Sequence, residues 1–176
     1  MKPKTIVQEG TDVLRKTAKP IPKTLFGSKE LKDIVADMTD ALDREADGVA
    51  LAAPQIGISY RIFIIRYDRI LPLPAKDMPP HPADIGIYIN PEVKKTSRRK
   101  VKIDEGCLSV RGIYGKTKRA ERATIEAFDQ SGKKFERGGG GVLAQIFQHE
   151  TDHLNGILFI DHASDMIEVK HHESPK

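Results

Sequence analysis

The stretch "QHETDHLNG", residues 148–156, places His149 and His153 four positions apart, with Glu150 beside the first histidine. Residues four apart lie one turn apart on the same face of an α-helix. Two imidazoles in that arrangement can bind one metal ion, and the glutamate can handle the proton of a bound water. The H-E-x-x-H pattern therefore predicts a metal site on a helix, whose class depends on the third ligand.

The helix that carries this pattern is expected to run from about Val142 to Asn155, with Gly156 as its C-terminal stop. It has an apolar stripe formed by Leu143, Ile146, Phe147 and Leu154. Such a stripe predicts packing into the core, with the two histidines and Glu150 on or beside the buried face. The alternative is that they are surface polar residues or hydrogen-bonded core histidines.

Two common sources of a third ligand do not fit this sequence. In metzincins a third histidine falls six residues after His153, where this chain has Phe159. A thermolysin-like site needs a glutamate on a further downstream helix. Only Glu168 and Glu173 follow, in a charged tail too short for a packed helix.

Histidines of the tail and the only cysteine remain as candidates. The tail histidines are His162, His171 and His172. Tail residues are usually mobile, which argues against a fixed ligand there. Cys107, in "DEGCLSV" (104–110), is the other candidate, although a lone cysteine is more often a small apolar core residue. Gly106 beside it permits close backbone approach, and Glu105 is an acid that could orient a ligand.

Length and composition favour a single domain over residues 1–176. The chain has 39% hydrophobic residues, one cysteine and a formal net charge of +4. One cysteine excludes an internal disulfide and fits a reducing compartment. No apolar run approaches the roughly 18 to 20 residues needed to span a bilayer. The first residues lack the features of a signal or transit peptide, so a cytoplasmic protein is expected, or an organellar one if the chain is a processed form.

The mild positive charge gives no strong nucleic-acid signal. Basic runs occur in "TSRRKVK" (96–102) and "GKTKRAER" (115–122). We interpret them as solvated strands and turns, which is the commoner role of such runs.

The rest of the chain alternates between helical and strand patterns. Residues 28–46 have helical apolar spacing with Ser28 as N-cap, and residues 61–66 and 85–93 are predicted strands. Residues 122–137 are typical of a hairpin that turns at 129–132. We expect an α+β fold, with mixed antiparallel sheets packed around the central C-terminal H-E-x-x-H helix.

Three further segments are predicted to lack regular structure. Prolines at 71–84 cannot donate ladder hydrogen bonds and predict a surface loop. The "GGGG" run at 138–141 is interpreted as a flexible turn, because no Gly-Lys-Ser/Thr follows it as in a phosphate-binding loop. The chain is expected to end in a short polar tail after about residue 162.

Three motifs taken together resemble the signature of the peptide deformylase family. They are "GVALAAPQ" (48–55), "EGCLS" (105–109) and "QHETDH" (148–153). The resemblance extends to "DVLRKTAKPI" (12–21), "INPEV" (89–93) and "LNGILFID" (154–161), and so covers nearly the whole chain.

The resemblance implies a hydrolase that removes the formyl group from N-terminal formylmethionine of new polypeptides and releases formate. It implies that Cys107, His149 and His153 bind one divalent ion, with a fourth position open for water. The expected ion is Fe²⁺, with Zn²⁺, Ni²⁺ or Co²⁺ as substitutes. Metal-bound water would attack the formyl carbon, with Glu150 as general acid and base.

The resemblance also assigns oxyanion and substrate contacts. The Gln55 side chain and the Leu108 backbone N–H would bind the oxyanion. Residues expected to contact substrate are Gly48, Val49, Ala50, Leu51, Ile103, Glu105, Gly106, Val142 and Ile146. An extended peptide could pair with the 48–55 segment as an added strand, although each apolar candidate could instead be ordinary core. Ala50 stands where family members usually have glycine, so its methyl group is expected near the substrate path.

The expected partners are N-formylmethionyl nascent peptides, which implies action near the ribosomal exit tunnel. Many bacterial members dock there by a long C-terminal helix, which is not evident in this sequence. A monomer without membrane attachment is expected. Two other classes stay open: a related metallopeptidase, and a non-catalytic binding module stabilised by metal.

Overall fold

The computed structural model describes residues 4–70 and 84–169, which form an α+β domain with two antiparallel sheets. The predicted loop at 71–84 therefore lies outside the described residues except for Asp84, which is exposed. No helix in the described part of the chain is both long and apolar enough to cross a membrane.

The larger sheet has five strands in the order β1-β2-β3-β6-β7. Their bounds are Ala50–Ala52 (β1), Ile62–Arg66 (β2), Ile85–Thr96 (β3), Arg122–Phe128 (β6) and Lys134–Gly140 (β7). All pairs are antiparallel. The strands predicted at 61–66 and 85–93 and the hairpin at 122–137 are thus confirmed, and β1 lies at a sheet edge.

The smaller sheet has three antiparallel strands in the order β4-β5-β8. They are Lys100–Cys107 (β4), Val110–Ala120 (β5) and Ser164–Glu168 (β8). The segment after 162 was predicted to lack regular structure, and this is wrong at β8, which pairs with β5 although all five of its residues are exposed. The tail beyond Val169 lies outside the described residues.

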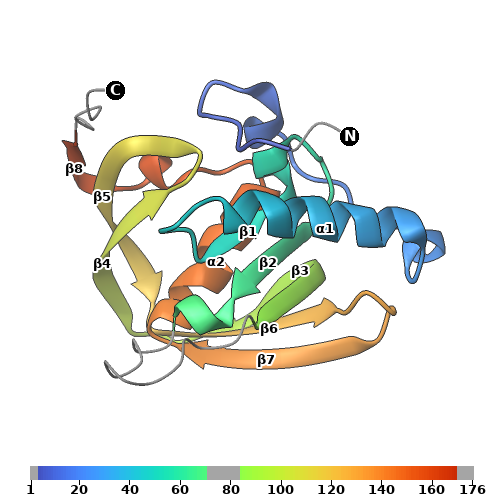
Figure 1. Cartoon of the computed structure of the whole chain (residues 1–176). Helices are drawn as coiled ribbons and strands as arrows, with labels where there is room; N and C mark the ends of the chain where they lie inside the picture. The colour runs from blue at the N-terminus through green and yellow to red at the C-terminus, as the bar shows by residue number, and fades with distance from the viewer. Residues whose placement is uncertain (1–3, 71–83, 170–176) are drawn as a thin grey trace, which may run out of the picture.

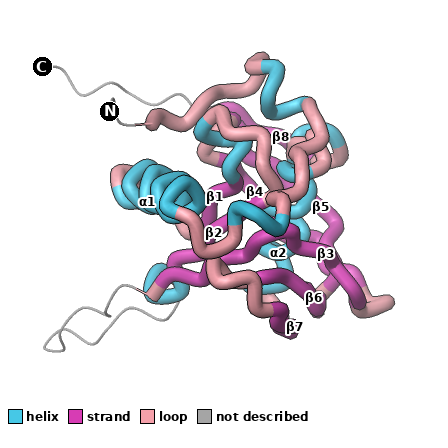
Figure 2. The backbone as a smooth tube through the Cα atoms, turned by 90° about the vertical axis from the view of Figure 1, so that its right-hand side faces the viewer, coloured by secondary structure: helices cyan, strands magenta, loops and turns pink. Residues whose placement is uncertain are grey.

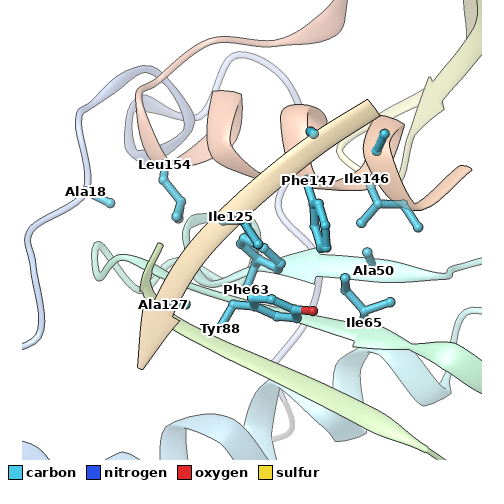
Figure 3. Packing of buried hydrophobic residues seen from close by; sticks show 13 residues of the cluster. Ala18, Ala50, Phe63, Ile65, Tyr88, Ile125, Ala127, Ile146, Phe147 and Leu154 are labelled. Atoms are coloured by element: carbon cyan, nitrogen blue, oxygen red, sulfur yellow. The ribbon is translucent and has the colours of Figure 1, made fainter. Parts of the chain in front are cut away.

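Helix α2, Val142–Leu154, lies between the two sheets and contacts strands of both (Figure 1). Its residue Phe147 is fully buried against Tyr88, which stacks on Phe63 with ring centroids 4.6 Å apart (Figure 3). The predicted helix at 142–155 is confirmed to within one residue. Because burying aromatic and aliphatic side chains stabilises the fold, this contact holds α2 in the core.

Helix α1, Lys29–Asp43, packs on the opposite face of the larger sheet (Figure 2). Ser28 Oγ accepts a hydrogen bond from Leu31 N at 3.2 Å, so the predicted N-cap is confirmed. The helix ends three residues before the predicted 46. Side chains alternate along the strands, so that Ala50 faces the α2 cluster and Leu51 faces the α1 cluster.

The prediction of a flexible turn at 138–141 is wrong for its first three residues. Strand β7 continues through Gly140, and Gly139 pairs with Ala123 of β6. A Cβ atom on Gly139 would lie 2.7 Å from Leu143 Cγ, so glycine lets the first turn of α2 lie against the strand. Only Gly141, with φ of 56°, leaves the strand and precedes the helix.

Gly156 ends α2 with a positive φ of 75°, as its predicted role requires. A Cβ there would also lie 2.6 Å from the Arg15 carbonyl oxygen. Gly156→Ala should therefore lower the free energy of unfolding in two ways. The left-handed backbone conformation costs about 1–2 kcal/mol, and overpacking costs about 1–3 kcal/mol. Chemical denaturation would measure the loss.

The matched control is Gly27→Ala, because Gly27 has φ of 74° and no heavy atom within 4 Å of its added Cβ. We expect this control to lose only the stability that corresponds to the backbone strain. An equal loss of stability in both variants would contradict the close contact at Gly156.

Candidate metal centre

Three metal-binding side chains from two elements meet between β4 and α2. Cys107 ends β4, and His149 and His153 lie one turn apart on α2. Their ligand atoms lie within 4.8 Å of one another, and Cys107 Sγ is 3.1 Å from His153 Nε2. The structure thus brings together the three ligands that the family resemblance implies. The described residues of this group could hold one metal ion.

A pocket of about 470 Å³ opens onto this group. The predicted site residues that line it are Gly48, Val49, Ala50, Gln55, Glu105, Gly106, Cys107, Leu108, Val142, Ile146, His149 and Glu150. His153 is buried and does not line the pocket. Two predicted substrate contacts do not line it either: Leu51 faces α1, and Ile103 lies half-buried in β4, two residues before Glu105.

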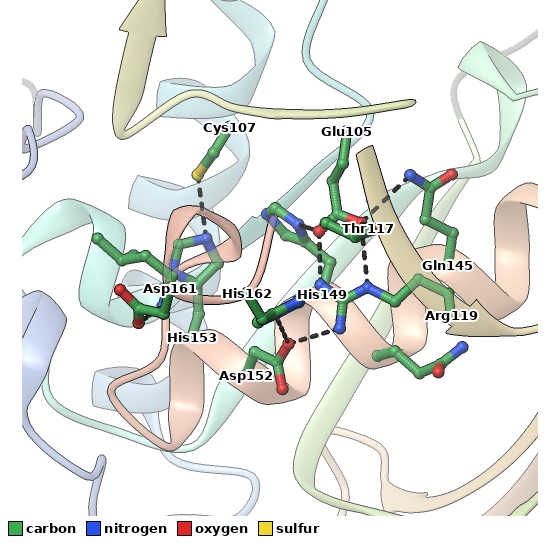
Figure 4. A network of polar contacts seen from close by, with 12 residues as sticks. Glu105, Cys107, Thr117, Arg119, Gln145, His149, Asp152, His153, Asp161 and His162 are labelled. Atoms are coloured by element: carbon green, nitrogen blue, oxygen red, sulfur yellow. Dashed lines mark hydrogen bonds and ion pairs between the residues drawn. The ribbon is translucent and has the colours of Figure 1, made fainter. Parts of the chain in front are cut away.

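Glu105 is buried and fixes the orientation of His149 (Figure 4). Its Oε1 lies 2.6 Å from His149 Nδ1, and Oε2 accepts hydrogen bonds from Thr117 Oγ1 at 2.6 Å and Arg119 Nε at 3.0 Å. Metal-binding histidines usually donate their second ring nitrogen to such a carboxylate. With Nδ1 engaged by Glu105, His149 Nε2 is the nitrogen available to a metal.

The pKa of Glu105 shows which charge state this arrangement favours. Burial alone would raise it, but the hydrogen bonds from His149 and Arg119 outweigh burial and hold the pKa well below its usual range. Glu105 is therefore an ionised carboxylate, which suits a hydrogen-bond acceptor for His149.

The residues that hold Glu105 were missed by the sequence analysis. Thr117 and Arg119 lie in the basic run 115–122, which was interpreted as solvated, yet both are buried. The interpretation fails because alternate residues of β5 face inward toward Glu105 and α2. Thr117 and Arg119 are two residues apart, and this spacing is the feature of the sequence that could have indicated that both face inward.

The environment of Glu150 differs from that of Glu105. Its side chain is buried, and Oε2 has no hydrogen-bond partner among the described residues. Burial raises the pKa of this carboxyl to about 7. A buried, unpartnered carboxylate oxygen beside a Cys/His/His donor set fits a divalent cation with a proton-transfer group next to it.

His153 is the most buried of the three candidate ligands. Burial lowers its pKa well below the usual value, so the imidazole is neutral and its nitrogen can bind a metal. Its Nδ1 has no partner among the residues that the structure describes.

Gln55 follows β1 in a short 3-10 turn, Ala53–Ile56, and its side chain is buried. Gln55 Oε1 accepts a hydrogen bond from Ala52 N at 2.8 Å. The amide nitrogen therefore faces the site, where it donates to Ser109 Oγ at 3.2 Å and lies 3.6 Å from Cys107 Sγ. This geometry makes Gln55 a fixed hydrogen-bond donor beside the ligands.

The other candidate ligands do not join the group. His162 Nε2 lies 3.5 Å from Asp152 Oδ2 and is not part of the cluster with Cys107. His171 and His172 lie outside the described residues.

Known proteins resemble this chain over most of its length. The family model described as polypeptide deformylase matches residues 3–168. The peptide deformylase of Dehalococcoides mccartyi (strain CBDB1) is 41% identical over 151 residues, 85% of this chain and 80% of that protein. The peptide deformylase of Thermomicrobium roseum is 38% identical over 168 residues, 92% of this chain and 86% of that protein.

Solved structures of peptide deformylases share the fold. A plant enzyme aligns with a TM-score of 0.80 at 34% identity, covering 94% of this chain and 83% of its own. The class I type b enzyme from Acinetobacter baumannii bound to Met-Ala-Ser aligns with a TM-score of 0.77 at 32% identity, covering 89% of this chain and 97% of its own.

The Glu105 network predicts a large loss of stability in Glu105→Gln. The change removes one of the two carboxylates that pair with the buried Arg119, and breaking a buried ion pair costs about 3–5 kcal/mol. Urea unfolding of the metal-free protein would measure this loss without a contribution from metal binding.

The matched control is Glu126→Gln, since Glu126 pairs with the exposed Lys134 at 3.0 Å. A surface pair of this kind contributes about 0–1 kcal/mol. If the two variants unfold at the same urea concentration, Glu105 does not have the buried role that we assign to it.

Proposed function

Since the chain belongs to the peptide deformylase family, we propose that this enzyme removes the formyl group from N-terminal formylmethionine of nascent polypeptides and releases formate. Cys107, His149 and His153 lie close together next to the buried Glu150, and a pocket opens onto this group. This observation carries the proposal. The related enzyme bound to Met-Ala-Ser supports a methionyl peptide as the product.

We propose that Cys107, His149 and His153 bind one divalent ion. A mixed thiolate and imidazole donor set suits both iron and zinc, and Fe²⁺ is the ion that we propose, with Zn²⁺, Ni²⁺ or Co²⁺ as substitutes. Three protein ligands leave a position for water, as in catalytic rather than structural sites. When bound, the ion supplies Lewis acidity that makes water nucleophilic near neutral pH.

Glu150 is the proposed proton carrier. Its pKa of about 7 means that the carboxylate can accept a proton from the attacking water and return it to the leaving amine nitrogen. Its unpartnered Oε2 supports this role, because no described residue competes for that oxygen. Glu150 is not one of the three ligands, so proton transfer and metal binding are assigned to different residues.

Gln55 and Leu108 are the proposed oxyanion donors. The Ala52 N–H holds the Gln55 amide so that its nitrogen faces Cys107 and the pocket before substrate arrives. Gln8 Nε2 donates to the Leu108 carbonyl at 3.0 Å and so holds the peptide unit that follows Leu108. Donors that are already oriented need no rearrangement as negative charge develops on the formyl oxygen.

The substrate peptide is proposed to extend β1. This strand is a sheet edge, and Gly48, Val49 and Ala50 line the pocket, so a peptide backbone could pair along it. Val142 and Ile146 supply apolar surface for the methionine side chain from the first turns of α2. Ala50 is among the residues that line the pocket, and we propose that its methyl group lies near the path of the peptide.

The alternative functions predict other site geometry. A structural zinc clip normally has four closed ligands, whereas the described cluster has three and opens onto a pocket. Such a clip also does not need a buried carboxylate such as Glu150.

We propose a cytoplasmic monomer that acts on nascent chains near the ribosomal exit tunnel. The proposed substrate class, formylated nascent peptides, supports this location.

The function is tested with formyl-Met-Ala-Ser and acetyl-Met-Ala-Ser on protein purified without air, with metal measured on the same sample. We expect formate release from the first peptide and little acetate from the second. Cleavage of an internal peptide bond would support a metallopeptidase, and a metal-loaded protein that releases no formate would exclude deformylation.

Glu150→Gln should keep the metal, because Glu150 is not a ligand, yet lower kcat by about 10²-fold or more through loss of the proton carrier. Metal content and formate release would be measured together. Glu136→Gln, a change at an exposed position of β7, is the control. Near wild-type turnover in Glu150→Gln would show that the proton passes through another group.

Gln55→Leu should lower kcat about 10²-fold and leave KM nearly unchanged, because the lost hydrogen bond forms mainly in the transition state. Steady-state kinetics on formyl-Met-Ala-Ser would separate the two constants. An effect confined to KM would mean that Gln55 only binds substrate.

A further inference from the structure

Arg119 links the strand that carries Cys107 to the helix that carries the histidines. Its Nε donates to Glu105 Oε2 at 3.0 Å, and its Nη1 donates to Asp152 Oδ2 at 2.6 Å. Arg119 is only 5% exposed. Figure 4 shows the guanidinium between the two carboxylates, so that one buried cation bridges β4 and α2.

Both carboxylates are close in sequence to candidate ligands. Glu105 is two residues before Cys107 on β4, and Asp152 directly precedes His153 on α2. The planar guanidinium holds its donors in a rigid fork, so it fixes the positions of the two groups relative to each other. A change in this bridge would therefore move Cys107 relative to His153, whose ligand atoms are 3.1 Å apart.

Asp152 has no assigned role in metal binding or proton transfer. Its side chain is 23% exposed, and the same Oδ2 that accepts from Arg119 lies 3.5 Å from His162 Nε2. It is not a member of the Cys107, His149 and His153 group. A carboxylate at this partly exposed position is not needed for burial of α2, which the apolar contacts of Phe147 already provide.

We propose that Asp152 is a positioning residue, which acts through Arg119 and Glu105 to set the separation between Cys107 and the histidines and so controls metal affinity. The inference rests on the proposed metal site. Arg119 supplies the link, but it also compensates Glu105, so removing it would disturb His149 directly. Asp152 can be changed while the Arg119–Glu105 pair is left in place.

Co²⁺ is the probe, because its visible absorption reports ligand geometry as well as occupancy. Metal-free protein would be titrated with Co²⁺ against a competing chelator, without air, for wild type, Asp152→Ala and Asp152→Asn. Loss of groups that support metal ligands costs about 10–100-fold in affinity. We expect Asp152→Ala to bind Co²⁺ about tenfold more weakly than wild type, with shifted visible bands. Asp152→Asn keeps an acceptor oxygen, so its affinity should lie between those of wild type and Asp152→Ala.

The matched control is Asp43→Ala, which removes a helix carboxylate that pairs with Arg66 and Arg69 and is not a member of the Cys107, His149 and His153 group. This variant should keep wild-type Co²⁺ affinity and spectrum. Thermal unfolding of each metal-free variant verifies folding, and Asp152→Asn serves if Asp152→Ala does not fold.

Wild-type affinity and spectrum in the folded Asp152 variant would overturn the inference, as would an equal loss in Asp43→Ala. Failure of the proposed metal site looks different, because wild-type protein would then bind no Co²⁺. Failure of the proposed deformylation would appear only as metal-loaded wild-type protein that releases no formate.

Discussion

Helix α2 is buried between the two sheets, and its packing there determines the geometry of the candidate site. Cys107 and the two histidines are more than forty residues apart in sequence, so they meet only if the helix is fixed against β4. Apolar contacts fix it on one side, where Phe147 packs on Tyr88. Polar contacts fix it on the other, where Glu105 and Arg119 reach His149 and Asp152. The site is therefore a property of the packed domain rather than of one motif.

Two buried glutamates near His149 lie in different electrostatic environments. Glu105 is held ionised by His149 and Arg119. Burial raises the pKa of Glu150 to about 7, and its Oε2 has no partner among the described residues. Environments that separate the pKa values of two carboxyls give them different roles. In the mechanism that we propose, Glu105 orients a metal ligand and Glu150 exchanges a proton during each turnover.

Features that depend on local pattern could be predicted from the sequence. The apolar stripe and Gly156 gave the bounds of α2, and the period-two pattern gave β2 and β3. Features that depend on tertiary packing could not. Gly139 continues β7 because it pairs with Ala123 of β6, and its missing Cβ leaves room for Leu143 of α2. Arg119 is buried because Glu105 faces it from the neighbouring strand. Leu51 was assigned to the substrate, yet strand alternation turns it toward α1.

We propose that one metal ion is bound by one sulfur and two imidazole nitrogens, from Cys107, His149 and His153. X-ray absorption on the zinc-loaded protein measures these ligands directly. We expect one sulfur at about 2.3 Å and two histidine nitrogens at about 2.0–2.1 Å, with a light atom completing the shell. A shell without sulfur, or one with a single histidine, would contradict it.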